Sequence, residues 1–91
     1  MSYEELLLAA KAVHDEVLET ATGRRFRVGV YMDCPFFIPE STGQGRADGR
    51  RAAERFLEHY NATGSLRAAD YQGLTFNASY LIALVIRARS L

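Results

Sequence analysis

The chain has 91 residues, 48% of them apolar and 24% charged, a balance typical of a globular domain that excludes an intrinsically disordered chain. Eleven basic residues cancel eleven acidic ones, so the chain lacks the overall positive field that draws proteins onto nucleic acid or anionic membranes. The single cysteine, Cys34, excludes an internal disulfide framework. We therefore expect one domain that spans residues 1–91.

The sequence shows neither a secretory signal nor a membrane-spanning segment. Its first residues lack the basic and apolar regions of a signal peptide. The longest uninterrupted apolar run, from Tyr80 to Ile86, has seven residues, whereas a membrane-spanning helix needs about 20. These features predict a soluble, cytoplasmic protein without membrane contact.

Residues 2–21 have the pattern of an amphipathic helix. Ser2 followed by Glu5 is a capping box, in which each side chain bonds the backbone amide of the other residue. Apolar residues then recur at spacings of three and four, and they are Tyr3, Leu6, Leu7, Ala10, Val13, Val17 and Leu18. Gly23 offers a stop in the left-handed conformation. The sequence thus predicts a helix over residues 2–21.

The pattern changes to a period of two over residues 25–32. Phe26, Val28, Val30 and Met32 fall on one face, which is typical of a half-buried strand. Residues 33–35 read as a turn, and residues 36–38 form a possible second strand that ends at Pro39, because proline removes a ladder donor.

Residues 51–60 fit a second amphipathic helix that follows a glycine-rich stretch. Asp48 is the expected N-cap, and Gly64 is the expected stop. Residues 65–72 have room for one further helical turn.

Residues 74–89 allow two interpretations. As a strand, alternate residues from Leu74 to Ala88 are all apolar, whereas a helix would scatter the polar residues around its circumference. The alternation favours a strand over residues 74–87, buried at its centre between neighbours. The predicted fold is a two-layer α+β domain with two helices on a sheet of two or three strands, and a homodimer would complete the sheet.

The stretch between Glu40 and Arg51 is the strongest functional candidate. Backbone amides at a helix N-terminus, freed by glycines and backed by arginines, are suited to an anionic ligand. The stretch lacks the lysine of a P-loop, and its glycines do not have the spacing of a dinucleotide fingerprint. A loop with solvated arginines is the alternative. The candidate anion-binding residues are Thr42, Gly43, Gln44, Gly45, Arg46, Arg50 and Arg51.

Two segments resemble known families. Residues 30–43 resemble the strand-to-helix turn of STAS domains, with Asp33 at the strand end and a Ser/Thr-Gly helix start. That resemblance implies that Ser41 or Thr42 is a phosphorylatable switch residue. Residues 57–75 are similar to helix-turn-helix sequences of phage terminase small subunits. This likeness implies a recognition helix that begins at Thr75 and a nucleic-acid-binding regulator built on residues 51–89.

Catalytic and metal-binding residues are scarce in the sequence. Cys34 would need His14 or His59 as a base within hydrogen-bond reach, and one cysteine with two distant histidines does not have the spacing of a zinc site. We expect a non-enzymatic regulatory module without cofactor or metal, which binds another protein or a small anionic ligand through residues 41–51. The alternatives are the nucleic-acid-binding regulator and a small enzyme that uses Cys34 or the glycine-rich loop.

Overall fold

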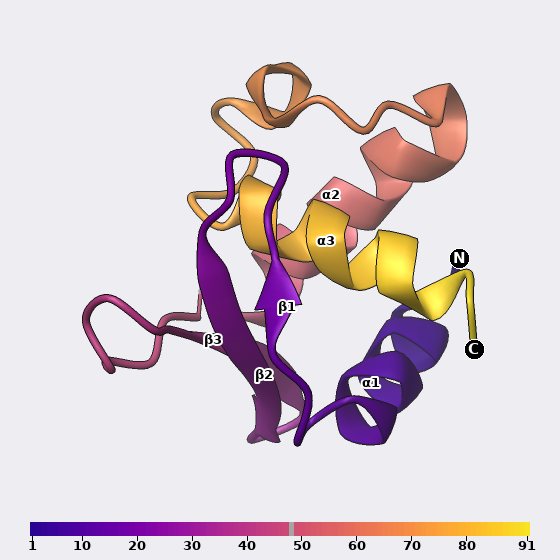
Figure 1. Ribbon diagram of the computed structural model, residues 1–91. Coiled ribbons are helices and arrows are strands. Elements are labelled where there is room, and N and C mark those ends of the chain that lie inside the picture. Colours follow the sequence, from indigo (N-terminus) through magenta and orange to yellow (C-terminus); the bar gives the residue numbers. More distant parts are fainter. Residues whose placement is uncertain (48) are drawn as a thin grey trace.

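A computed structural model describes residues 1–47 and 49–91, and this part of the chain folds into three helices and a three-stranded antiparallel sheet (Figure 1). The predicted α+β class is confirmed. In chain order the elements are α1 (Tyr3–Ala12), β1 (Leu18–Glu19), β2 (Arg25–Tyr31), β3 (Cys34–Pro39), α2 (Arg50–Thr63), the short 3-10 helix η1 (Ala68–Tyr71) and α3 (Ala78–Ala88).

The sheet has the order β1-β2-β3, and two of the three predicted strands belong to it. The strand predicted over residues 25–32 is confirmed as β2, and the one predicted over residues 36–38 is confirmed as the centre of the longer β3. The turn predicted over residues 33–35 is present but begins one residue earlier and is shorter, because Cys34 and Pro35 already belong to β3. The hairpin turns at Met32 and Asp33, whose φ values of 52° and 59° match the tight turn that the twist of two antiparallel strands favours.

The outer edge of β3 is closed to further strands. Pro35 and Pro39 carry no N–H group, and Phe37 exchanges both of its backbone hydrogen bonds with Arg46, at 2.8 and 2.7 Å. These are the devices by which proteins block edge-to-edge pairing. A homodimer therefore would not extend the sheet at β3, and dimerisation itself stays a prediction.

The first helix is shorter than its pattern predicts. The capping box at Ser2 and Glu5 is confirmed, but α1 ends at Ala12 instead of continuing to residue 21. Leu18 pairs with Phe26 in the sheet and is buried there, so its apolar side chain reaches the core from a strand. Glu16, in the turn between α1 and β1, accepts two hydrogen bonds from Arg87, at 2.9 and 3.0 Å, which ties this turn to the end of α3.

The strand predicted over residues 74–87 is wrong, because the chain forms α3 there. A helix that is apolar on all sides is stable when it is surrounded by other elements. The segment from Tyr80 to Val85 is buried throughout, and α3 packs against α1, α2, η1 and β1 (Figure 1). Its polar residues do not need a common wet face, since Ser79 lies in the first turn and Arg87 in the last. Without a strand at residues 74–87, dimerisation cannot proceed by strand pairing there.

The second helix agrees with its prediction and is longer. Gly64, with φ of 68°, caps the C-terminus of α2 in the left-handed conformation, and the helical turn expected within residues 65–72 is η1. Gly49 is the N-cap residue of α2, whereas Asp48, which was predicted for that position, lies outside the described residues. In the part of the chain that the structure describes, no helix has both the length and the apolar character needed to cross a membrane.

Candidate functional site

A cavity of about 780 Å³ lies where the start of β2 meets the segment that follows β3. Two stretches distant in the sequence form most of its wall, and Tyr80 of α3 contributes to it as well. The lining residues are Gly23, Arg24, Arg25, Pro39, Glu40, Ser41, Thr42, Arg46 and Tyr80.

Strand pairing brings these residues together. The register of the β2–β3 hairpin places Phe26 opposite Pro39, and the Glu40 N–H donates to the Arg25 carbonyl at 2.9 Å. The chain then returns, because Arg46 pairs with Phe37 at the outer edge of β3. The Arg46 guanidinium lies 5.6 Å from the centroid of the Tyr80 ring, within the range of a cation–π contact.

The cavity carries an excess of positive charge. Its described lining includes three arginines and one carboxylate, that of Glu40, which lies 3.4 Å from Arg25. Both side chains of this ion pair are more than half exposed, so the pair adds little to stability. Arginine presents its N–H donors in a planar fork that matches carboxylate and phosphate oxygens. The side chains therefore suit an anionic group.

Four backbone amides of the loop donate to oxygens of the protein. The N–H groups of Thr42 and Gly43 donate to the Pro39 carbonyl at 3.3 and 2.8 Å, and the Gln44 N–H donates to the Thr42 hydroxyl at 3.2 Å. The Arg46 N–H donates to the Phe37 carbonyl. These four amides are therefore occupied, and the arginine side chains are the charged donors that the cavity offers to an anion.

Two of the loop glycines have structural roles. Gly43 adopts a φ of 67°, which side-chain-bearing residues rarely adopt. At Gly45, an added Cβ atom would lie 3.2 Å from the Phe36 ring, so glycine lets the loop pack closely on that ring. Neither glycine lines the arginine cavity, and neither does Gln44.

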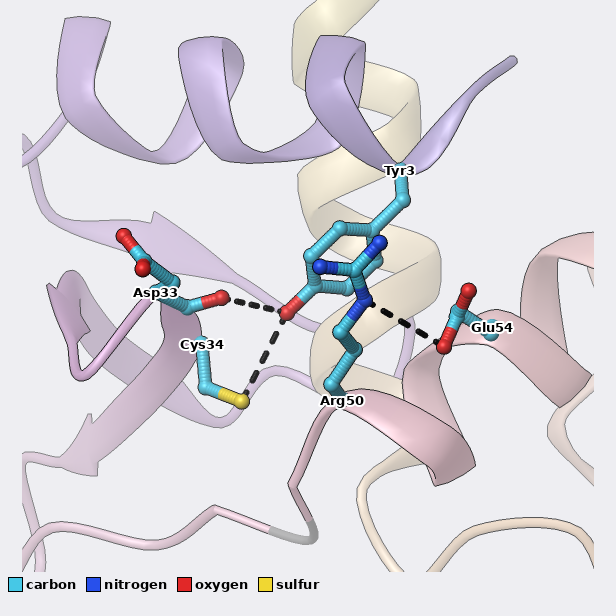
Figure 2. A network of polar contacts seen from close by, with 5 residues as sticks. All are labelled: Tyr3, Asp33, Cys34, Arg50 and Glu54. Atoms are coloured by element: carbon cyan, nitrogen blue, oxygen red, sulfur yellow. Dashed lines mark hydrogen bonds and ion pairs between the residues drawn. The ribbon is translucent and has the colours of Figure 1, made fainter.

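The structure separates the predicted arginines. Arg46 lines the cavity together with Thr42, whereas the Arg50 guanidinium lies 4.5 Å from the centroid of the Tyr3 ring and its Nε 3.3 Å from the Glu54 carboxylate (Figure 2). Arg51 is exposed in the first turn of α2. Arg24 and Arg25 were missed by sequence reasoning. The predicted strands could have identified them, since a hairpin of residues 25–32 and 36–38 places residue 25 near residues 39 and 40.

A second polar cluster joins the N-terminus of α1 to the β2–β3 hairpin (Figure 2). The Tyr3 hydroxyl donates to the Asp33 carbonyl at 2.5 Å and also lies 3.5 Å from the Cys34 sulfur. Burial raises the pKa of Tyr3 above its ordinary value of 10.0, and the hydrogen bond to Cys34 raises this pKa further. The cluster holds Tyr3 in its neutral form and anchors the hairpin to the first helix.

This cluster does not assemble a thiol–imidazole pair. His14 Nδ1 lies 2.8 Å from the Lys11 carbonyl, and the His59 ring packs edge-on against Tyr71 with centroids 5.0 Å apart. These contacts of the two imidazoles do not involve the Cys34 thiol. Within residues 1–47 and 49–91, no three side chains of the metal-ligating types gather into a group.

Because of Tyr3, we expect the stability of the protein to fall at alkaline pH. Because the pKa of Tyr3 is higher in the folded chain than in the unfolded chain, its contribution is complete below about pH 10 and is lost as the pH rises further. We expect the urea midpoint to fall above about pH 10, and Tyr3→Phe to make that fall shallower. Tyr31→Phe, which removes the hydroxyl of an exposed tyrosine, is the matched control. An equally steep fall in Tyr3→Phe would contradict this account.

The two family resemblances gain no structural support. The STAS likeness requires a helix to start near Ser41, but this segment is a turn and α2 begins at Arg50. The helix-turn-helix likeness requires an exposed recognition helix, but α3 buries most of its residues. No family model, no curated protein and no solved structure matches the chain. Fold and site together define a small α+β domain with an arginine-lined cavity.

Proposed function

We propose that the protein is a non-enzymatic binding module that takes an anionic group, a phosphate or a carboxylate, into the arginine-lined cavity. One observation carries this proposal: the side chains of Arg24, Arg25 and Arg46 come from two separate segments and line one cavity that holds a single described carboxylate. Ten of the eleven basic residues of this chain are arginine, so the presence of arginine alone is not evidence of a binding site. The convergence of three arginines at one place supports a binding site.

The chemistry of the cavity supports a ligand that is polar at one end. The arginines supply forked donors, and the hydroxyl groups of Ser41 and Thr42 supply further hydrogen bonds. The volume of about 780 Å³ leaves room for a small molecule, and because the cavity is open to solvent, the rest of a larger ligand can extend out of it. A free phosphate compound and an acidic side chain of a partner protein share this chemistry, so the experiment must separate them.

The test is to titrate inorganic phosphate, citrate, ATP and a poly-glutamate peptide into the protein. Binding is measured by thermal shift and by calorimetry. We compare the native protein with the double variant Arg24→Gln/Arg46→Gln. The control is Arg51→Gln/Arg67→Gln, which removes the same charge at exposed positions outside the cavity. We expect the cavity variant to bind its anion at least about tenfold more weakly, since one charge-assisted hydrogen bond contributes roughly 1.5–3 kcal/mol.

The two variants also distinguish specific binding from general attraction. An equal loss in both double variants would mean that the anion responds only to net charge, and equal binding by the native protein and the cavity variant would reject the site. Because Arg46 also contacts Tyr80, the single variant Arg24→Gln is measured as well, so that a folding defect is not mistaken for a lost ligand contact.

A further inference from the structure

The anion site leaves the outer face of the β2–β3 hairpin unexplained. Residues on the inner face are buried against the helices, which all lie on one side of the sheet in Figure 1. The strand alternation places Arg27, Gly29 and Tyr31 of β2 on the outer face, together with Phe36 and Ile38 of β3. These five residues are exposed or partly exposed.

Two aromatic rings meet on this face. The side chain of Tyr31 is 69% exposed, and its ring contacts that of Phe36 edge-on, with centroids 6.5 Å apart. Phe36 lies across Gly29, where an added Cβ atom would stand only 2.6 Å from the ring. The glycine thus lets the ring rest against the backbone of the sheet. Phe36 is partly exposed and Tyr31 is exposed, and aromatic rings on an open sheet face are suited to stacking with planar groups.

The aromatic pair lies on the same face of the hairpin as Arg27 and Ile38, which line a hollow beside the arginine cavity. This hollow, of about 330 Å³, shares Pro39 and Glu40 with the cavity. The resulting strip runs from the cavity past Arg27 to Phe36 and Tyr31. The six steps of β2 from Arg25 to Tyr31 correspond to roughly 20 Å.

Charge along this strip favours an extended anion. Four arginines border it, namely Arg24, Arg25, Arg27 and Arg46. Two carboxylates stand beside Arg25: Glu40 in an ion pair and Glu19 as its partner on β1. The strip therefore keeps two positive charges in excess, although the whole chain has a formal net charge of zero.

We propose that this strip binds single-stranded nucleic acid, with phosphates in the cavity and at Arg27 and with bases stacked on Phe36 and Tyr31. The inference rests on the proposed anion site, to which it gives a ligand class. Unpaired bases expose the ring faces that stacking requires, whereas bases in a duplex are already stacked. The aromatic pair on the open face of the sheet thus fits a single strand better than a duplex.

The test is fluorescence anisotropy with labelled oligo-dT and oligo-rU of about ten nucleotides, at salt concentrations from about 50 to about 200 mM. Tyr31→Ala should weaken binding roughly fivefold to a hundredfold, the effect of removing one stacking ring. Tyr31→Phe keeps the ring and should restore most of the affinity. The matched control is Phe76→Ala, because Phe76 is 92% exposed but lies outside the strip.

The phosphate contact is tested separately. Arg27→Gln should reduce the slope of log affinity against log salt by about 0.7, the share of one phosphate on a single strand, while Arg67→Gln should leave that slope unchanged. Equal losses in Tyr31→Ala and Phe76→Ala would overturn the inference. A second outcome would also overturn it: the protein binds no oligonucleotide but self-associates, and Tyr31→Ala abolishes the self-association. The face would then be a protein interface.

The outcomes distinguish this inference from the proposed function. If inorganic phosphate or ATP binds through Arg24 and Arg46 but neither oligonucleotide binds, the strip fails and the anion site stands. If no anionic probe binds at all, both fail. Oligonucleotide binding that is lost in Tyr31→Ala and weakened in Arg24→Gln supports both.

Discussion

Replacing Phe26 with alanine is expected to lower the free energy of unfolding by about 3–5 kcal/mol. The Phe26 side chain is fully buried, and its ring packs edge-on against Tyr80 and Phe37, with centroids 4.9 and 5.9 Å apart. These three rings join β2, β3 and α3, so the substitution removes contacts to a second strand and to a helix at once. A domain of this size has a total stability of roughly 5–15 kcal/mol, so the loss is a large part of the whole.

Urea unfolding followed by circular dichroism measures this effect as a shift of the midpoint at constant slope. Phe26→Leu, which refills most of the volume, should lose clearly less than Phe26→Ala. Leu8→Ala is the surface control, because Leu8 is 65% exposed on α1, and its effect should stay within about 0.5 kcal/mol. A loss at Phe26 no larger than the loss at Leu8 would show that the ring cluster is not the core.

The elements with local signals could be predicted from the sequence. The capping box needs only Ser2 and Glu5, the left-handed stop of α2 needs only Gly64, and β2 shows its period of two within seven residues. In each case the residues that carry the signal also make the contact. The sequence signal and the element that it predicts lie in the same short stretch of chain.

The wrong predictions concern elements whose secondary structure depends on contacts with distant segments of the chain. Leu18 fits the stripe of a helix as well as a strand, and its pairing with Phe26 places it in β1, beyond the end of α1. Residues 78–88 carry an apolar pattern that suits a buried strand or a buried helix, and such a run cannot be assigned by periodicity alone. The helix is favoured because α1, α2 and the sheet surround it, which satisfies its apolar circumference without requiring hydrogen bonds from neighbours.

The candidate site was predicted in part for the same reason. Thr42 and Arg46 were identified from the loop itself, whereas Arg24 and Arg25 reach the cavity through the register of β2 and β3. The loop glycines indicated a backbone cradle, but Gly45 serves the contact with Phe36. A glycine can permit a close approach of ligand or of protein, and the sequence does not distinguish them.

Placing proline at residue 83 tests the helical state of the C-terminal segment. Ala83 is 8% exposed in the middle of α3, where proline would remove one backbone hydrogen bond and clash with the preceding turn. We expect Ala83→Pro to lower the free energy of unfolding by about 3 kcal/mol or more, with additional loss because α3 packs against three other helical elements and β1. The protein should show a reduced helical signal and a much lower urea midpoint.

Glycine at the same position separates the backbone effect from the loss of the methyl group. Ala83→Gly keeps the N–H group, and we expect it to cost about 1 kcal/mol for the helix propensity of glycine, with a small further loss of packing. The ratio of the two effects is the diagnostic quantity, because proline must be several times more harmful than glycine if residue 83 lies inside a helix. Similar losses in both variants would contradict a continuous α3 between Ala78 and Ala88.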